Sequence, residues 1–479
     1  MIGREKEGKR LMAAAASKRS EFVAVYGRRR IGKTYLVRQL LGNRFTFCHT
    51  GIENGGVREQ LRAFSSSMAE FGYSPARPIR SWMDAFDEIR RIVKESPAEK
   101  KIIFLDELPW MDTPKSGFVS ALEFFWNGWA SARDDVMLVI CGSATSWIVN
   151  KLLKARGGLH NRTTDQIWLK PFTLGECREY MESLGVRLSP MDIAEGYMAM
   201  GGVPYYWSFF RGNLSLAQNI DELFFAPDAR LRLEFGQLYS SLFKNPEPYM
   251  KIITALGEKA KGLTREELAS RIAASESGKL SGWIEELEQC GFIRRYHPFG
   301  AVKKGYLCQL IDNYSLFYLR FIKENTRHDP RFWSSVYARP VHRVWAGLAF
   351  ERLCLQHVDQ LRSALGIGGV VSDVCAWRCV DGAEGGAQVD LVIDRDDRVI
   401  NLCEMKYCDA PFEVSKKQDA ELRRRRHVFE RETGTAKTVH LTLVTSVGLA
   451  DTEYKGVFQS VVTLDELFTG LTFERRLQN

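Results

Sequence analysis

The first residues that could do chemistry lie near the N-terminus and follow the spacing Gly-x-x-x-x-Gly-Lys-Thr. Glycines at both ends of such a loop let the chain curl, so that backbone N–H groups point inward at phosphate oxygens. We expect Lys33 to reach the terminal phosphates and the Thr34 hydroxyl to ligate Mg²⁺. The pattern therefore predicts a P-loop that binds ATP, or a close relative, with Mg²⁺. The residues that form it are Gly27, Arg28, Arg29, Arg30, Ile31, Gly32, Lys33 and Thr34.

The acid pair Asp106 and Glu107 follows a run of four apolar residues, 102–105. Such a run indicates a buried strand, and the pair would sit at its carboxyl end. There we expect Asp106 to hold Mg²⁺ through water and Glu107 to orient and polarise the attacking water. The alternative is a solvated acidic strand end, and the P-loop in the same chain argues against it.

Two further candidates follow the next apolar strand. Ser143 could hydrogen-bond the γ-phosphate or the attacking water, or it could cap the N-terminus of a helix. Arg162 could neutralise transition-state charge as an arginine finger does, or it could be an ordinary surface arginine. The sequence leaves both pairs of alternatives open.

A separate group of chemical residues lies near the other end of the chain, where Asp390 is followed by Glu404 and Lys406. Glu404 and Lys406 are two apart on an expected strand, so they project from one face. If the hairpin turn is centred on Asp397, Asp390 lies opposite Glu404 with Cβ atoms about 5 Å apart. Two carboxylates and one ammonium on one face suit Mg²⁺-assisted phosphodiester cleavage. A surface cross-strand ion pair is the alternative.

Apolar runs at 21–26, 101–106 and 136–141 predict the strands that position the first group, and helical segments such as 118–130 separate them. Alternation of helices with wholly apolar strands predicts a parallel α/β sheet covered on both faces. We expect this core to occupy residues 1–170.

The middle of the chain is expected to be mostly helical. The pattern at 171–244 predicts helices with a break at 201–204. The pattern at 245–330 predicts three helices followed by a β-hairpin, which is the order of a winged helix. The third of these helices, 279–290, is acidic. The basic residues Arg294, Arg295, Lys303 and Lys304 lie on the hairpin instead, so contact with a nucleic-acid backbone and packing between domains both remain open.

Residues 331–479 form the last predicted domain. They predict a helix at 341–361, a hairpin of 388–394 with 399–407, a basic helix at 413–432 and a strand at 439–445. The basic run at 423–427 could lie along a phosphate backbone, although about half of it at most can face one ligand. A solvated charged face is the alternative.

Five segments of the N-terminal half together resemble archaeal-type P-loop ATPases related to AAA+ and signalling ATPases. The resemblance covers residues 1 to about 240 and implies ATP binding and hydrolysis, with a helical lid at 171–244. Asn161-Arg162 stands where this family commonly has Gly-Arg. The matching segments are residues 2–5, 25–34, 105–110, 141–143 and 201–205.

Residues 335–465 resemble the PD-(D/E)xK nuclease superfamily. Asp390 matches the metal-binding aspartate, and Glu404-x-Lys406 matches the E-x-K element. Glu351 matches the acidic residue that often completes the metal site. The resemblance implies either an active nuclease domain or a nuclease-like fold that does not cut.

Composition adds weaker constraints. The net charge of +8 and pI of 8.9 favour an anionic partner such as DNA. No apolar stretch reaches 18 residues and the N-terminus is charged, so we expect neither a membrane span nor a signal peptide. The ten scattered cysteines, of which Cys375 and Cys379 are the closest approach to a metal pair, predict a reduced, cytoplasmic protein without zinc.

The sequence thus predicts an α/β protein with a P-loop sheet, a helical lid, a winged helix and a C-terminal α/β domain like that of restriction endonucleases. The expected function is Mg²⁺-dependent ATP binding and hydrolysis coupled to a DNA-binding or DNA-cleaving domain, with homo-oligomers left open. The alternative is an ATP-dependent regulatory switch whose C-terminal domain binds nucleic acid or protein without cleavage.

Overall fold

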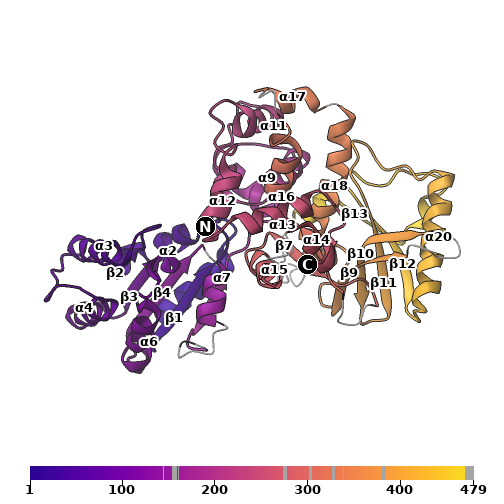
Figure 1. Cartoon of the computed structure of the whole chain (residues 1–479). Coiled ribbons are helices and arrows are strands. Elements are labelled where there is room, and N and C mark those ends of the chain that lie inside the picture. Colours follow the sequence, from indigo (N-terminus) through magenta and orange to yellow (C-terminus); the bar gives the residue numbers. More distant parts are fainter. Residues whose placement is uncertain are drawn as a thin grey trace. The chain divides into compact units, whose positions relative to one another are not determined.

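The structure, a computed structural model, divides into two compact units (Figure 1). Unit 1 comprises Met1–Pro171 and Ser240–Lys244, and unit 2 comprises Phe172–Tyr239 and Asn245–Asn479. No helix among the described residues is long and apolar enough to cross a membrane. The residues described are 1–143, 145–153, 159, 161–272, 278–300, 305–325, 329–337, 339–379 and 385–469.

Unit 1 is built on a five-stranded parallel sheet of order β2-β3-β4-β1-β5, which confirms the predicted parallel core. Three strands were predicted from their apolar runs, and they occupy the middle of the sheet. The two edge strands are missing from the prediction because each mixes polar with apolar residues. The strands are β1 (Glu21–Tyr26), β2 (Phe45–Thr50), β3 (Lys101–Asp106), β4 (Val136–Gly142) and β5 (Asp165–Trp168).

Helices cover both faces of this sheet, which explains why its central strands are apolar throughout. Side chains of α3, α4 and α6 pack with one set of strand residues, and those of α1 and α2 pack with the other. The helices of unit 1 are α1 (Glu5–Ala16), α2 (Lys33–Leu41), α3 (Val57–Glu70), α4 (Trp82–Glu95), α5 (Leu108–Met111), α6 (Phe118–Gly128) and α7 (Thr145–Ile148).

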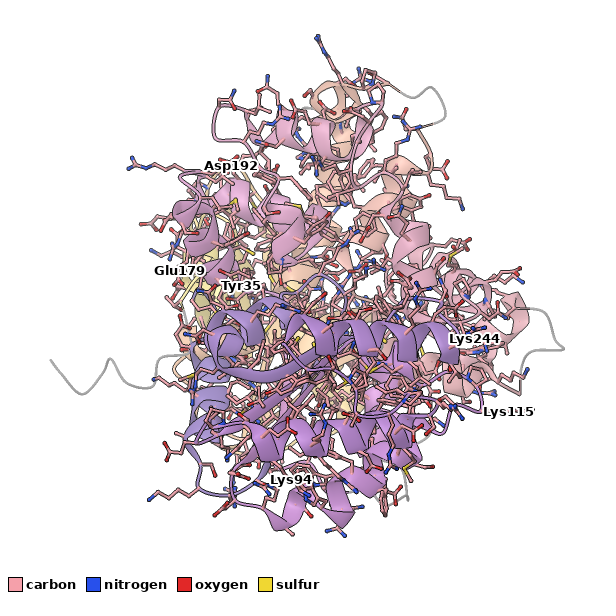
Figure 2. All side chains as sticks on the ribbon, turned by 90° about the vertical axis from the view of Figure 1, so that its left-hand side faces the viewer. Tyr35, Lys94, Lys115, Glu179, Asp192 and Lys244 are labelled. Carbon is pink, nitrogen blue, oxygen red and sulfur yellow. The ribbon has the colours of Figure 1, made fainter. Side chains whose placement is uncertain are left out.

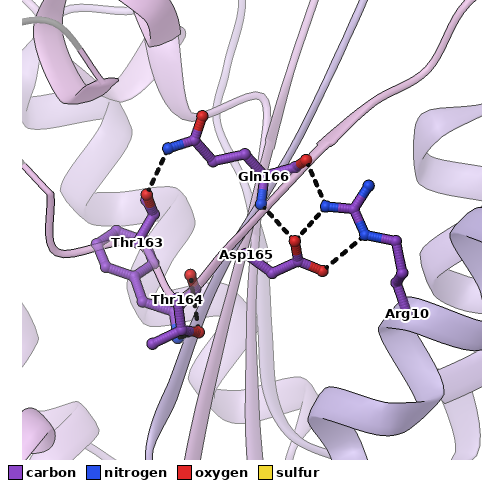
Figure 3. Close-up of polar contacts among 6 residues, drawn as sticks. Arg10, Thr163, Thr164, Asp165 and Gln166 are labelled. Atoms are coloured by element: carbon purple, nitrogen blue, oxygen red, sulfur yellow. Dashed lines mark hydrogen bonds and ion pairs between the residues drawn. The ribbon is translucent and has the colours of Figure 1, made fainter.

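Edge strand β5 is tied to α1 by a polar contact (Figure 3). Arg10 donates from Nε to Asp165 at 3.1 Å and from its terminal nitrogen to the Gln166 carbonyl oxygen at 2.8 Å. Thr164 accepts a hydrogen bond from the Phe22 N–H at 2.9 Å. The Arg10 side chain is 48% exposed, so its ion pair adds at most about 1 kcal/mol to stability. These contacts therefore mainly fix the register of β5 beside β1.

Unit 2 begins with helices that turn sharply at Gly201 and Gly202, as the sequence predicts. The Phe172 N–H donates to the Gly202 carbonyl oxygen at 2.6 Å, and a Cβ at Gly202 would lie 1.9 Å from the Phe172 oxygen. Only glycine allows this approach. The first helices are α8 (Leu174–Ser183), α9 (Pro190–Met200), α10 (Pro204–Trp207), α11 (Leu216–Ile220) and α12 (Glu234–Leu242), the last of which ends in unit 1.

Three helices and a small antiparallel sheet of order β6-β8-β7 follow. The helices and the hairpin agree with the prediction, whereas the two-residue strand β6 is too short to leave a sequence pattern. Lys303 and Lys304 lie outside the described residues. The elements are α13 (Glu247–Gly257), β6 (Leu263–Thr264), α14 (Arg265–Arg271), α15 (Leu280–Gln289), β7 (Ile293–Tyr296) and β8 (Leu307–Leu310).

The last part of unit 2 carries a five-stranded mixed sheet of order β13-β12-β11-β10-β9. Strands β9, β10 and β11 are antiparallel neighbours, while β11, β12 and β13 run parallel. The strands are β9 (Ser372–Cys379), β10 (Ala387–Arg395), β11 (Val399–Lys406), β12 (Thr438–Thr445) and β13 (Ser460–Thr463). The remaining helices are α16 (Asn313–Phe317), α17 (Phe332–Val336), α18 (Pro340–Gln356), α19 (Val358–Ala364), α20 (Lys416–Thr433) and α21 (Leu464–Leu467).

The single helix predicted at 341–361 is wrong, because the chain breaks at His357 between α18 and α19. The His357 ring is 1% exposed. Its Nδ1 lies 2.8 Å from the Leu353 carbonyl oxygen, and its Nε2 accepts a hydrogen bond from the Leu174 N–H at 3.1 Å. The two contacts require a neutral ring with its proton on Nδ1. Apolar periodicity does not reveal such a break.

A second buried contact joins the mixed sheet to the first helices of unit 2. Tyr407, the residue after β11, donates from its hydroxyl to Glu195 Oε1 of α9 at 2.6 Å. Glu195 is 3% exposed. Strand β11, which carries Glu404 and Lys406, is therefore anchored to α9.

Burial lowers the pKa of His357 to about 4, which makes the stability of unit 2 depend on pH. The unfolded chain binds a proton near pH 6.5 and the folded chain does not, so stability falls as pH drops below 6.5. We expect His357 to account for about 2 kcal/mol of lost unfolding free energy between pH 7 and pH 5. Urea titrations of wild type and His357→Gln at both pH values measure this.

His297→Gln is the matched control, because His297 is exposed. It should keep the wild-type pH dependence. An equal loss between pH 7 and pH 5 in wild type and His357→Gln would contradict the assignment.

Candidate functional site

The predicted P-loop connects β1 to α2 and needs glycine at both ends. Gly27 has φ 146°, and a Cβ there would lie 2.4 Å from the Leu169 carbonyl oxygen. Gly32 has φ 89°, which also favours glycine. Within the loop Arg28 and Ile31 are buried, while Arg29 and Arg30 are half-buried. The backbone therefore follows the tight path that phosphate binding requires.

Lys33 at the start of α2 is buried, with 4% of its surface exposed. Its ammonium donates to the Arg28 carbonyl oxygen at 2.9 Å and to the Ser143 hydroxyl at 3.2 Å. Burial lowers the pKa of Lys33, and the nearby acids partly oppose this. An anion placed against the loop would stabilise the charged form.

Thr34 and Asp106 bring together the oxygen atoms of the expected Mg²⁺ site. The Thr34 hydroxyl lies 3.0 and 3.2 Å from the two Asp106 carboxylate oxygens. Burial raises the pKa of Asp106, which is 3% exposed, and Glu107 raises it further. A hydroxyl beside a carboxylate is a donor set that Mg²⁺ prefers, so these residues fit the cation.

Glu107 is held by Ser143 at the carboxyl end of β4. It accepts hydrogen bonds from the Ser143 N–H at 3.0 Å and from the Ser143 hydroxyl at 2.6 Å. The Ser143 hydroxyl thus bridges Glu107 and Lys33. Glu107 has φ 46°, a conformation that costs a non-glycine residue about 1–3 kcal/mol and often occurs at functional sites.

Arg162 is not part of this group. It is exposed and precedes β5, whose Asp165 pairs with Val23 near the start of β1. Because β1 and β5 are parallel, Arg162 lies at the amino end of the sheet. The P-loop follows the carboxyl end of β1, which is the opposite end of the sheet. The arginine-finger interpretation of Arg162 has no support from this arrangement within the chain.

Arg4 contributes to the site, although no role for it was predicted. It is 6% exposed, and its guanidinium donates to the Ile31 carbonyl oxygen at 3.2 Å and to the Lys170 carbonyl oxygen at 2.9 Å. Arg4 therefore fixes the P-loop to the segment after β5. Tyr35, next to Thr34, is exposed, with 64% of its surface accessible to solvent (Figure 2).

Residues 1–208 match the family described as an ATPase domain predominantly from Archaea. This part of the chain is therefore similar to archaeal-type ATPase domains. The match contains the P-loop, Asp106, Glu107 and Ser143, so ATP binding and hydrolysis are the activities expected of the ATPase domain.

Other proteins are similar over longer stretches. An uncharacterized protein of Methanocaldococcus jannaschii is 23% identical over 413 residues, which is 85% of this chain and 88% of the relative. A Walker-type ATPase of Pyrococcus abyssi is 16% identical and covers 67% of this chain and 96% of its own, with a TM-score of 0.49. The ORC2 protein of Aeropyrum pernix is 10% identical and covers 71% and 96%, with a TM-score of 0.40.

Outside the ATPase domain, a cavity of about 840 Å³ in unit 2 contains the second predicted group. The register Leu391↔Cys403, extended by one residue, places Asp390 opposite Glu404, as the hairpin prediction requires. Both carboxylates line the cavity with Lys406 and Glu351. Burial raises the pKa of Glu351 to about 7, and the nearby Asp390 adds to this.

The acidic residues of the cavity are not arranged as a ready metal site. Glu404 is paired with Lys406 at 2.7 Å and with Arg425 at 2.6 Å, and Asp390 accepts a hydrogen bond from Gln388. No group of three or more metal-ligating side chains is gathered within the described part of the chain. The predicted ligand set of Glu351, Asp390 and Glu404 therefore does not fit a metal ion in this arrangement.

The basic run of α20 is mostly engaged in local ion pairs. Arg423 pairs with Asp419 at 2.9 Å and Arg424 with Glu421 at 2.7 Å. Arg425 is the member of the run that lines the cavity. Arg423 thus fits the alternative of a solvated charged face, whereas Arg425 belongs to the lining of the cavity.

Replacing Ser143 with alanine tests the link between Lys33 and Glu107. We expect kcat for ATP hydrolysis to fall about tenfold, because Glu107 loses a charge-assisted hydrogen bond. The Kd for ATP should change less than about threefold, since the loop backbone is intact. Steady-state kinetics and equilibrium nucleotide binding measure both. Ser131→Ala, on the exposed surface of unit 1, is the control, and a Ser143→Ala protein with wild-type kcat would refute the assigned role.

Proposed function

We propose that the protein is a Mg²⁺-dependent ATPase whose unit 2 binds nucleic acid in the cavity near Asp390 and Glu404. The proposed ATPase activity rests on the assembly of Lys33, Thr34, Asp106 and Glu107 at one end of the parallel sheet. The family match over residues 1–208 supports it.

Each residue of the ATPase site has a proposed role. The P-loop N–H groups and Lys33 bind the phosphates, while Thr34 and Asp106 hold Mg²⁺. Bound Mg²⁺ neutralises charge that develops on the phosphate oxygens. Glu107 orients and polarises the attacking water, and Ser143 fixes the direction of its carboxylate. The strained backbone of Glu107 supports this role.

The charges of the cavity support nucleic-acid binding in unit 2. Seven Lys or Arg and five Asp or Glu side chains line it. Tyr296 and Trp377 also line it, and aromatic rings are surfaces on which bases stack. DNA is the partner we favour, because the net charge of the chain is +8 and two predicted modules suit DNA.

DNA cleavage by residues 331–479 is a second candidate, favoured by the opposition of Asp390 and Glu404 beside Lys406. The chain order also supports a nuclease-like fold, with α18, the antiparallel strands β9 to β11, then α20 and the parallel strand β12. The pairing of Glu404 with two cations favours binding without cleavage. We likewise propose that residues 245–330 are a winged helix and residues 171–244 a lid.

Communication between the two sites is proposed to run through α9. This helix lies within the segment that matches the ATPase family and contacts the end of β11 through Glu195 and Tyr407. Movement of α9 during the nucleotide cycle would thereby reach Lys406.

An assay on the full chain tests these proposals. Labelled single-stranded, duplex and branched DNA are incubated with Mg²⁺ or Mn²⁺, with and without ATP, and binding, cleavage and ATP hydrolysis are all measured. We expect DNA binding by wild type, and DNA should change the ATP hydrolysis rate at least about twofold if the sites communicate. Asp390→Ala should retain ATP hydrolysis and lose any cleavage.

Asp373→Asn is the matched control, since Asp373 is exposed on the neighbouring strand β9. Absence of binding to every DNA would refute the DNA proposal. Cleavage that persists in Asp390→Ala would refute the cleavage candidate.

A further inference from the structure

Arg352 is a buried cation that faces the cavity and is incompletely bonded. It lies on α18 with 9% of its surface exposed, and it lines the cavity beside Glu351. Its Nε has no hydrogen-bond partner among the described residues. A terminal nitrogen reaches the Leu348 carbonyl oxygen only at 3.5 Å. A guanidinium this buried normally has better partners, because an unmet donor costs about 1–3 kcal/mol or more.

Arg294 of β7 faces the same cavity. Its Nε donates to Gln309 Oε1 at 2.7 Å, and its guanidinium lies 4.8 Å from the centre of the Tyr296 ring. Burial lowers the pKa of Arg352 to about 10; the charge of Glu351 opposes this shift and the charge of Arg294 adds to it. The two guanidiniums thus line one cavity.

Lys261 is a third cation of this wall and contacts the side-chain oxygen of Gln388. Among the described residues, the hydrogen-bond partners of Arg294, Arg352 and Lys261 are neutral amide or carbonyl oxygens. None of the three forms an ion pair within the described residues. By contrast, Lys406 and Arg425, which line the same cavity, share the carboxylate of Glu404. The carboxylates of Glu351 and Asp390 line the same cavity and act on these arginines through space, but neither forms an ion pair with them among the described residues.

We propose that Arg294 and Arg352 bind the terminal phosphate of a single nucleic-acid strand, with Lys261 at the edge of the same site. This inference rests on the proposed nucleic-acid function and specifies its substrate class. A phosphomonoester carries about −1.5 to −2 charges at pH 7 and three acceptor oxygens, which matches two guanidiniums that line one cavity. An internal phosphodiester carries a single charge and matches them less well.

The size and lining of the cavity also fit a strand end. Its volume of about 840 Å³ lies in the usual range of about 300–1,000 Å³ for pockets that enclose small ligands. Such a pocket has room for a terminal nucleotide. The ring of Tyr296, backed by the Arg294 guanidinium, offers a surface for the terminal base. A bound terminal phosphate would place the adjoining linkage near Asp390, Glu404 and Lys406.

Equilibrium binding of short oligonucleotides tests the proposal without requiring cleavage. Fluorescence anisotropy is measured on the full chain in EDTA, with strands of one sequence that carry a 5′-phosphate, a 3′-phosphate or no terminal phosphate. We expect one phosphorylated end to bind about tenfold or more tighter than the unphosphorylated strand. Arg352→Gln should reduce this preference to about twofold or less. Arg343→Gln on the exposed surface of the same helix should leave it unchanged.

Thermal unfolding and ATP hydrolysis show whether each variant folds. If Arg352→Gln does not fold, Arg294→Gln replaces it, because Arg294 is half-buried, and the same loss of preference is expected. Equal binding of all three wild-type strands, or an intact preference in the folded variants, would overturn the proposal. Competition by inorganic phosphate or a mononucleotide as strong as by the phosphorylated strand would also overturn it.

The outcome separates this inference from the proposed function. Binding of DNA without any preference for a phosphorylated end contradicts the strand-end site and leaves DNA binding in place. Failure of every strand to bind contradicts both. Preference without cleavage supports the strand-end site and counts against the nuclease candidate.

Discussion

The ATPase domain depends on one constraint, a lysine ammonium buried at the carboxyl end of a parallel sheet. Lys33 is 4% exposed, and its contacts are the Arg28 carbonyl and the Ser143 hydroxyl. Burying a charge is costly unless it is paired. The glycines of the loop, the anchoring of the loop by Arg4 and the bridge from Ser143 to Glu107 all place polar atoms around this ammonium. The arrangement is completed by an anion, and ATP supplies one.

Unit 2 also buries positively charged side chains, but with a different set of partners. Its cavity is lined by Arg294 and Arg352, with neutral hydrogen-bond partners, and by the ion-paired group of Glu404, Lys406 and Arg425. The positive charge of Arg294 and Arg352 favours a phosphate, while the Glu404 carboxylate is already paired with the side chains of Lys406 and Arg425. This balance favours binding of a nucleic-acid strand over a preassembled cleavage site. The contact of Tyr407 with Glu195 joins the cavity to a helix within the segment matched by the ATPase family.

Sequence patterns predicted the features that have a strong local cause. The apolar strands around the P-loop and the hairpin register that opposes Asp390 to Glu404 are examples, since both follow from periodicity. The break at His357 and the role of Arg4 depend on partners distant in sequence, Leu174 and Lys170, and leave no local pattern. Arg352 was missed for a similar reason, because its burial comes from the packing of α18. The sequence left Arg162 open between an arginine finger and a surface arginine, because its motif gives no information on which end of the sheet it occupies.

The most direct test of the account is the equilibrium affinity for ATP·Mg²⁺ of wild type and Lys33→Ala, measured by isothermal titration calorimetry on the full chain. If the buried ammonium binds the phosphates, the variant should lose about 100-fold or more in affinity, because a charge-assisted contact disappears from a buried site. The unfolding temperature of the variant without nucleotide should not fall. Equal affinities for ATP·Mg²⁺ in the two proteins would contradict the account.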